Sequence, residues 1–252
     1  MNLAEQLKEL RFNILRDTSD IIAGDRDSLW DDETLIRYIG DAERRFTRRT
    51  LILRDSTTTQ VTRIKLQNGV KTYPLDPSIL AVISANYNNA PSDLLHSGHA
   101  TVVASPPTEF MTFNPNAYYQ LPPGDPIAYY TDESLVYAQE GRVTLTVYPY
   151  PGPAQAGLYI NMRVARMPLT CYDKADQNRR SEIPESYVLD VLEWAAYRAQ
   201  RTFDADAGAP TSADAHKKAF DEAVTNAIEE AKRKMFGYMG YKYGRNGFAW
   251  VR

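Results

Sequence analysis

Apolar residues recur at helical spacing in two stretches at each end of the chain, whereas the middle of the chain alternates apolar and polar residues. Near the N-terminus the apolar spacings are four, three and four. This spacing predicts an amphipathic helix whose buried face is formed by Leu3, Leu7, Leu10 and Ile14. A helix of this kind needs another apolar face to cover it.

The second predicted helix begins within the stretch SLWDDETL. Asp31 can cap its first turn, and Trp30 and Leu35 occupy the two positions of a hydrophobic staple. The apolar face then continues to about Arg49 through Ile39, Ala42 and Phe46. We therefore expect this helix to pack on the first.

Helical spacing returns near the C-terminus. The stretch SEIPESYVLDVLEWAAYRAQRTF predicts a third helix with Pro184 in its first turn. The stretch ADAHKKAFDEAVTNAIEEAKRKMFG predicts a fourth, with cations in its last turn and Gly237 just beyond its end as a stop signal. The apolar stripe of the fourth helix is Phe220, Val224, Ile228, Ala231 and Met235.

The middle of the chain has the two-residue period of β-strands. In VTRIKLQNGVKTYPL the pair Asn68-Gly69 separates two alternating runs, which predicts a β-hairpin. Further strand-like runs are separated by turn-forming stretches rich in Pro, Gly and Asn. These runs are ILAVISANY, ATVVAS, IAYYT, SLVYAQ, RVTLTVYPY and LYINMRVARM. We expect them to form short antiparallel strands.

This order of elements predicts an α+β fold. The two chain ends form a four-helix platform, residues 1–52 plus 181–236, since each amphipathic helix needs a partner face. Residues 53–180 form an inserted antiparallel β-sandwich or small barrel, and residues 237–252 form an extended C-terminal arm.

Composition narrows the functional classes. The net charge is −3 and the basic residues are spread along the 252 residues, so the overall balance does not indicate a nucleic-acid or membrane partner. No run of apolar residues is long enough to cross a bilayer, and the N-terminus lacks the pattern of a secretory signal. Cys171 is the only cysteine, which excludes an intrachain disulfide and a cysteine-based metal cage.

The sequence offers no familiar catalytic frame. GxSxG, GxxxxGK[ST], HExxH and a GxGxxG that follows a strand are all absent, so we predict no catalytic residue, no cofactor and no metal. His96 and His99 fit a polar turn better than a metal site, because no cysteine stands near them. The acidic stretch GDRDSLWDDE fits a helix entry better than a calcium loop. His216 is expected on the solvated side of the fourth helix.

Arginines are concentrated in RRFTRRTLILR, at the end of the second predicted helix: Arg44, Arg45, Arg48, Arg49 and Arg54. One interpretation is that they complement the helix dipole and form ion pairs between helices. The other is a contact with a negatively charged partner, either an acidic protein surface or phosphates. A salt-dependent binding assay separates the two.

The last residues, GYMGYKYGRNGFAWVR, combine glycines, aromatics and cations without an acid. This stretch can pack on its own domain, bind another protein as an extended arm, or stack on single-stranded nucleic acid. We favour the arm, because rigid aromatic side chains are effective interface anchors. The predicted anchors are Tyr238, Met239, Tyr241, Tyr243, Phe248 and Trp250.

Three passages together resemble the head-to-tail adaptor (connector) proteins of tailed bacteriophages. They are LWDDETLIRYIGDAERRFTRRT, then RVTLTVYPYPGPAQAGLYINMRVARMPLT, then SEIPESYVLDVLEWAAYRAQRTFDAD followed by a long helix. The resemblance covers roughly residues 20 to 235. It implies a helical core with an inserted β domain and no catalytic site.

The resemblance also implies partners and a location. Such adaptors form a ring, of twelve copies, beneath the portal protein, and a C-terminal extension docks on the portal. A tail or nozzle protein follows, and DNA passes through the channel without specific recognition. The expected location is the neck of the virion, after assembly in the host bacterial cytoplasm, with no membrane partner.

Two other functional classes remain open on the sequence. The tyrosines in NAYYQL, IAYYT and TVYPYP are compatible with a carbohydrate-binding, tail-associated protein, although sheet packing also accounts for them. The arginine cluster and the C-terminal stretch are compatible with nucleic-acid binding.

Overall fold

The computed structural model describes residues 1–17, 29–88, 100–104, 122–133, 143–202 and 210–238. The chain divides into two compact units. Met1–Ile52 and Tyr172–Arg252 make up the helical unit, and Leu53–Cys171 make up the strand unit. The mixture of helix and sheet confirms the α+β class.

The first helix changes its winding part-way along. α1 (Leu3–Lys8) is capped by Asn2, whose side chain accepts from the Glu5 N–H while the Glu5 carboxylate accepts from the Asn2 N–H. It continues into the π-helix η1 (Glu9–Ile14). Leu3 and Leu10 are fully buried, and Leu7 and Ile14 pack against the same core, as predicted.

The second helix, α2 (Asp32–Thr50), begins where the sequence predicts. The Asp31 side chain caps it and accepts from the Thr34 N–H at 2.6 Å. The residues of the predicted apolar face have no exposed surface: Leu35, Ile39, Ala42 and Phe46. The 3.6-residue period therefore located this face correctly.

Two details at the C-terminal helices differ from the prediction. Pro184 precedes a 3₁₀ turn, η3 (Glu185–Tyr187), and α6 (Val188–Thr202) starts only after it, so the proline is not inside the first α-helical turn. α7 (Pro210–Tyr238) includes Gly237, which therefore does not stop the helix. The glycine's cost of about 1 kcal/mol is small against the packing of a long helix.

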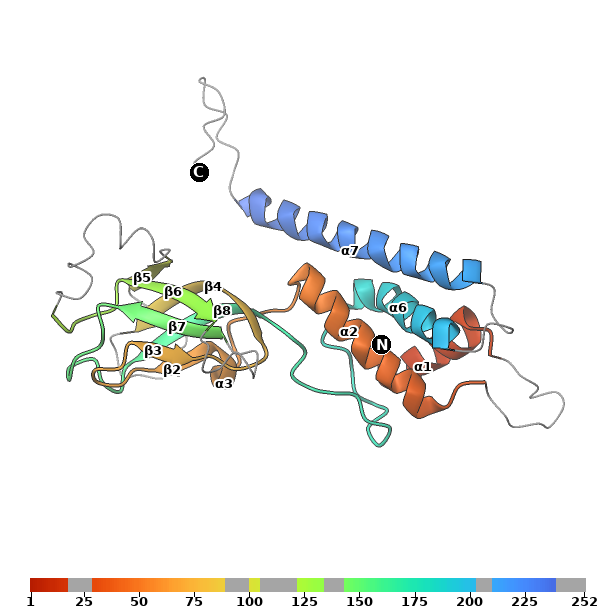
Figure 1. The fold of residues 1–252 in the computed structure, drawn as a ribbon, viewed down its shortest axis with the longest axis horizontal. Helices are drawn as coiled ribbons and strands as arrows, with labels where there is room; N and C mark the ends of the chain where they lie inside the picture. Colours follow the sequence, from red (N-terminus) through yellow and green to blue (C-terminus); the bar gives the residue numbers. More distant parts are fainter. Residues whose placement is uncertain (18–28, 89–99, 105–121, 134–142, 203–209, 239–252) are drawn as a thin grey trace, which may run out of the picture. The chain divides into compact units, whose positions relative to one another are not determined.

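The helices share one core. α6 packs against both α2 and α7 (Figure 1), and buried residues of α1, η1, α2, α6 and α7 form a single apolar cluster. At its centre the ring of Phe220 lies 6.1 Å from that of Phe46 and 5.2 Å from that of Trp194. His216 is only 18% exposed and its Nδ1 lies 2.6 Å from Glu193 Oε2, so the expectation that it is solvated was wrong. It stands at the edge of α7 that faces α6.

The strand unit is one open succession of strands (Figure 1), in the order β1-β8-β4-β5-β6-β7-β3, with β2 also paired to β8. β5 and β6 run parallel, contrary to the prediction, and all other pairs are antiparallel. The succession ends at β1 and β3, so the described strands do not close into a barrel. The bounds are β1 (Arg54–Asp55), β2 (Arg63–Lys65), β3 (Thr72–Pro74), β4 (Ile79–Asn88), β5 (Ala100–Ala104), β6 (Ala128–Glu133), β7 (Val143–Tyr148) and β8 (Tyr159–Arg166).

The predicted hairpin is not formed. Asn68-Gly69 does make a turn, with Gly69 at φ 74°, but β2 pairs with β8 and β3 pairs with β7. The Leu66 N–H donates to Leu158 O at 2.8 Å and the Gly69 N–H donates to Pro151 O at 2.9 Å. The turn closes on itself with a main-chain bond, from the Val70 N–H to Gln67 O at 3.2 Å, while Leu66 and Gly69 bond to the segment between β7 and β8.

Two further strand predictions need comment. The residues just before β2 form a short helix, α3 (Thr59–Thr62), and not a strand. The run SLVYAQ lies outside the described residues. The other predicted strands are confirmed as β4, β5, β6, β7 and β8.

Candidate assembly site

The arginines at the end of α2 divide into two sets. Arg45 stacks on Trp194 of α6, with its Cζ 3.9 Å from the ring centre. Arg49 forms an ion pair with Asp221 of α7. These two residues therefore tie α2 to its neighbouring helices. Arg44 and Arg48 are exposed at the surface, while Arg54 belongs to β1 of the strand unit.

The predicted C-terminal anchors are only partly described. Tyr238 is the last residue of α7, so the predicted arm overlaps the end of this helix by two residues, Gly237 and Tyr238. The side chain of Tyr238 and the other five anchors, Met239, Tyr241, Tyr243, Phe248 and Trp250, lie outside the described residues. His96 and His99 lie outside them as well.

The structure describes four of the six tyrosines that motivated a sugar-binding interpretation. Tyr129 and Tyr148 are buried, and burial raises the pKa of both phenols. Tyr130 and Tyr150 are half-buried. The stretch NAYYQL lies outside the described residues. Buried rings cannot serve as a platform for a sugar, so these contacts do not favour that interpretation.

A buried carboxylate in the helical unit escaped the sequence analysis. Glu43 on α2 is only 5% exposed and accepts hydrogen bonds from Tyr172 Oη and Ser181 Oγ. Gln6 Nε2 of α1 in turn donates to Tyr172 Oη at 3.3 Å. The network therefore joins two helices to the segment that follows the strand unit in the sequence. The spacing in the sequence could have indicated this burial, because Glu43 follows Ile39 by four residues and therefore lies on the apolar face of the helix.

Burial raises the pKa of Glu43 above its usual value of 4.5, and the hydrogen bonds from Ser181 and Tyr172 oppose this only in part. A raised pKa means that the folded state binds the proton more tightly than the unfolded state. Stability is then highest at low pH and falls as pH rises from 4.5 through the folded-state pKa.

We predict that Glu43→Gln raises the melting temperature at pH 8 by a few degrees and leaves it nearly unchanged near pH 4. The glutamine Oε1 can still accept from both hydroxyls, and the variant carries no charge to bury. Differential scanning calorimetry from pH 4 to 8 measures this, with the exposed Glu222→Gln as the control. An unchanged pH dependence in Glu43→Gln would contradict the prediction.

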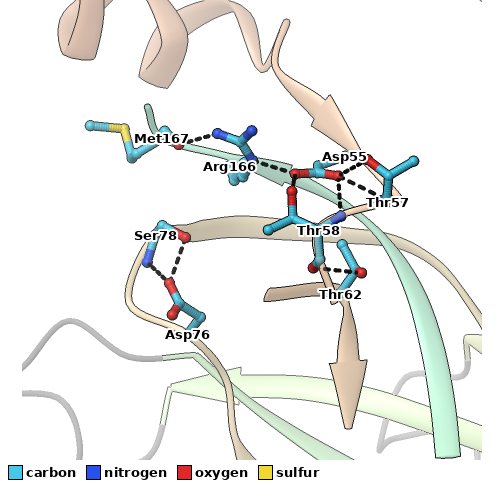
Figure 2. Close-up of polar contacts among 8 residues, drawn as sticks. All are labelled: Asp55, Thr57, Thr58, Thr62, Asp76, Ser78, Arg166 and Met167. Atoms are coloured by element: carbon cyan, nitrogen blue, oxygen red, sulfur yellow. Dashed lines mark hydrogen bonds and ion pairs between the residues drawn. The ribbon is translucent and has the colours of Figure 1, made fainter. Parts of the chain in front are cut away.

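A second polar cluster lies in the strand unit (Figure 2). The Asp55 side chain is 6% exposed, and its Oδ2 lies 2.7 Å from Arg166 Nε and 2.6 Å from Thr58 Oγ1. Its Oδ1 accepts from the N–H groups of Thr57 and Thr58 at 2.8 and 3.0 Å, and from Thr57 Oγ1 at 3.1 Å. Protein donors therefore surround the whole carboxylate.

Burial by itself would raise the pKa of Asp55, but the hydrogen bonds from Thr58, Thr57 and Arg166 outweigh burial and hold this pKa well below its usual value. Asp55 is therefore ionised across the physiological pH range. Because its acceptor positions are occupied by the protein's own donors, the cluster is suited to holding structure and not to binding a ligand.

The Asp55 cluster ties together the two ends of the strand unit. The Arg166 N–H donates to Leu53 O at 3.0 Å, and Arg166 Nη1 donates to Met167 O at 3.1 Å. Beside it, the Met167 N–H donates to Ser78 O at 2.8 Å, and Asp76 Oδ1 accepts from the Ser78 N–H (Figure 2). The segment that enters the strand unit and the one that leaves it are thereby bonded to each other.

Two properties of the described residues bear on metal-binding and membrane-spanning functions. Within these residues, no three His, Cys, Asp or Glu side chains come together in a way that could hold a metal ion. None of the described helices combines the length and the apolar character needed to cross a bilayer. Cys171 is exposed at the surface and is not part of a disulfide.

Comparison with known proteins decides the family. The family model for the SU10 adaptor protein matches residues 1–241, a range that includes the whole strand unit and all described helices. The chain belongs to the SU10 adaptor protein family. The adaptor is therefore a structural protein of a phage virion. A search of curated proteins found no match to the chain.

The family match includes the arginines of α2, the Glu43 network and the Asp55 cluster of the adaptor. It ends after Tyr241, within the predicted arm. Tyr243, Phe248 and Trp250 lie beyond the matched residues. These three aromatics therefore belong to a part of the adaptor that the family pattern does not include.

Proposed function

We propose that this adaptor assembles as a ring of identical copies beneath the portal protein and joins the capsid to the tail around the DNA channel. The observation that carries the proposal is the family match, which runs through both units of the chain. In a ring, each copy repeats the same contact with its neighbour, and such repeated contacts suit a structural protein that has no catalytic role. Twelve copies are the expected number.

The parts of the chain have different roles in this proposal. The helical unit makes the lateral contacts of the ring, and the exposed Arg44 and Arg48 would contact an acidic surface of a partner. The C-terminal aromatics dock on the portal, and the strand unit faces a neighbouring copy or the tail or nozzle protein. The net charge of −3 suits a ring through which DNA slides, because a strongly basic lumen would hold the phosphates.

The proposed location is the neck of the virion, and assembly would take place in the host cytoplasm before or during the joining of head and tail. No catalytic step, cofactor or membrane contact is part of the proposal. DNA would pass through the channel without specific recognition.

The test is to mix the full-length adaptor with purified portal rings of the same phage and to count the bound copies. We expect a closed ring in electron micrographs and one adaptor per portal subunit by mass measurement. The adaptor without portal, and the portal without adaptor, are the controls. A portal that binds no adaptor over a range of salt concentrations would overturn the proposal.

A further inference from the structure

The sheet of the strand unit has one apolar face and one polar face. On β8, Ile160, Met162 and Val164 are buried in the core. Because side chains alternate along a strand, the residues between and before them lie on the opposite face. The strand register places residues of β2 and β4 beside them on that face. We call this surface the basic face: Arg63, Lys65, Ser84, Asn86, Tyr159, Asn161 and Arg163.

Three of these seven residues are cations and none is an acid. Lys65 and Arg163 are exposed. Arg63 lies flat over Tyr159, with its Cζ 3.8 Å from the ring centre, and this stacking orients the guanidinium. The face is therefore positively charged, although the chain as a whole is acidic.

Asn161, in the middle of the basic face, indicates which chemical groups a binding partner would bring to this face. Its Nδ2 and Oδ1 are both buried, and neither has a hydrogen-bond partner among the residues that the structure describes. A buried donor and a buried acceptor without partners both destabilise the fold, so a partner that satisfies them is favoured. Peptide groups and amide side chains can satisfy both atoms, whereas a phosphate offers acceptors only. The flanking Arg63 and Tyr159 are only half-buried, so a partner that draws Arg63 outward reaches the amide.

The helical unit carries an acidic surface that complements this face. Asp31, Asp32 and Glu33 stand at the start of α2, and Asp31 and Glu33 are exposed. Lys174 Nζ lies 3.7 Å from Glu33 Oε1, which brings the turn with the exposed Asp173 and Asp176 beside them. We call this surface the acidic corner. It has five acids and one lysine: Asp31, Asp32, Glu33, Asp173, Lys174 and Asp176. Arg11 Nη2 lies 2.6 Å from Asp32 Oδ1, so the net negative charge comes from the other four acids.

We propose that the basic face of one copy binds the acidic corner of the next copy. This inference rests on the proposed ring and specifies its lateral contact: the helical unit of one copy, through its acidic corner, meets the strand unit of the neighbouring copy. Two different, complementary surfaces on one chain produce a head-to-tail contact, and repeated head-to-tail contacts close into a ring when the rotation allows it. Charge complementarity at exposed residues also makes the contact sensitive to salt.

The test is a charge exchange in the full-length adaptor, assembled on portal rings. The variant Lys65→Glu/Arg163→Glu makes the basic face acidic, and the variant Glu33→Lys/Asp176→Lys makes the acidic corner basic. Each variant alone brings like charges together, so we expect its lateral association to weaken about tenfold or more. In an equal mixture, the acidic face of the first variant can pair with the basic corner of the second, and the two unaltered surfaces can pair with each other. Closed rings in which the two variants alternate should therefore return.

The matched control is Lys217→Glu/Lys218→Glu, which makes the same change of charge on exposed residues of α7. Melting curves of all variants verify that they fold. Rings formed by wild type and by both variants alike would overturn this inference and leave the proposed function intact. Failure of wild type to form rings would instead overturn the proposed function.

The experiment also separates other occupants of the basic face. A four-fold variant that carries all the exchanges in one chain restores a contact within a chain as well as one between chains. If that variant forms rings but the mixture does not, the contact is within one chain and the inference fails. If the basic-face variant still forms rings but loses binding to a DNA oligonucleotide in a mobility-shift assay, the face binds nucleic acid and the inference also fails.

Discussion

Asp55→Ala is expected to lower the free energy of unfolding of the strand unit by about 3–5 kcal/mol. Arg166, whose side chain is 13% exposed, would keep its charge without the carboxylate that compensates it. The N–H and hydroxyl groups of Thr57 and Thr58 would lose their acceptor as well. Urea denaturation of the full-length adaptor, followed by tyrosine fluorescence and circular dichroism, measures the loss.

Asp76→Ala is the matched control for Asp55→Ala. Asp76 also accepts from a nearby main-chain N–H and hydroxyl, those of Ser78. Among the described residues, no arginine forms an ion pair with it. We expect Asp76→Ala to cost only about 1 kcal/mol. Equal losses in the two variants would show that the ion pair to Arg166 adds nothing beyond a local turn.

The stability of the adaptor at acidic pH provides an independent test of the role of Asp55. The pKa of Asp55 is lowered in the folded state, so its stabilising contribution is complete above about pH 4 and disappears as pH falls through the lowered pKa. In Asp55→Ala this part of the acid-induced loss of stability should be missing.

Ending the chain at Tyr238 is expected to leave the adaptor folded but to abolish its binding to the portal. The truncation removes five of the six predicted anchors and keeps α7 complete. Aromatic anchors at an interface commonly contribute about 2 kcal/mol or more each, so a loss of about a hundredfold or more in affinity is expected. Surface plasmon resonance on immobilised portal rings measures the affinity, and calorimetry verifies the fold.

We expect portal binding to depend on the aromatic residues of the C-terminal stretch and not only on the length of that stretch. Replacing Tyr241, Tyr243, Phe248 and Trp250 by alanine is expected to reproduce the effect of the truncation. Replacing Lys242, Arg245 and Asn246 by alanine, within the same stretch, should retain most of the affinity. Portal binding that survives the truncation would remove the docking role from these aromatics.

The local rules of helices were sufficient to predict much of the helical unit. The face of α2 and its cap at Asp31 follow from spacing and from the hydrogen-bonding needs of a helix end, both of which are properties of neighbouring residues. Glu43 shows the limit of that reasoning. Its position on the apolar face is visible in the sequence, but its partners Tyr172 and Ser181 are more than a hundred residues away.

The sequence predicted the positions of the strands better than it predicted which strands pair with each other. Alternation placed β4, β7 and β8 correctly, because the two-residue period is a property of each strand by itself. It does not report which strand lies alongside. The Asn68-Gly69 turn was therefore read as a hairpin, although the flanking strands pair with β8 and β7.

The sequence alone determined the α+β class, the helix faces and caps, and the resemblance to phage adaptors, since these depend on local periodicity and on patterns along the chain. Only the tertiary structure decided the sheet order, the ion pair of Asp55 with Arg166, the burial of Glu43 and the gathering of Arg63, Lys65 and Arg163 on one face. Each of these joins residues distant in the chain. Such contacts are selected by the packing of whole elements and leave no periodic signal in the sequence.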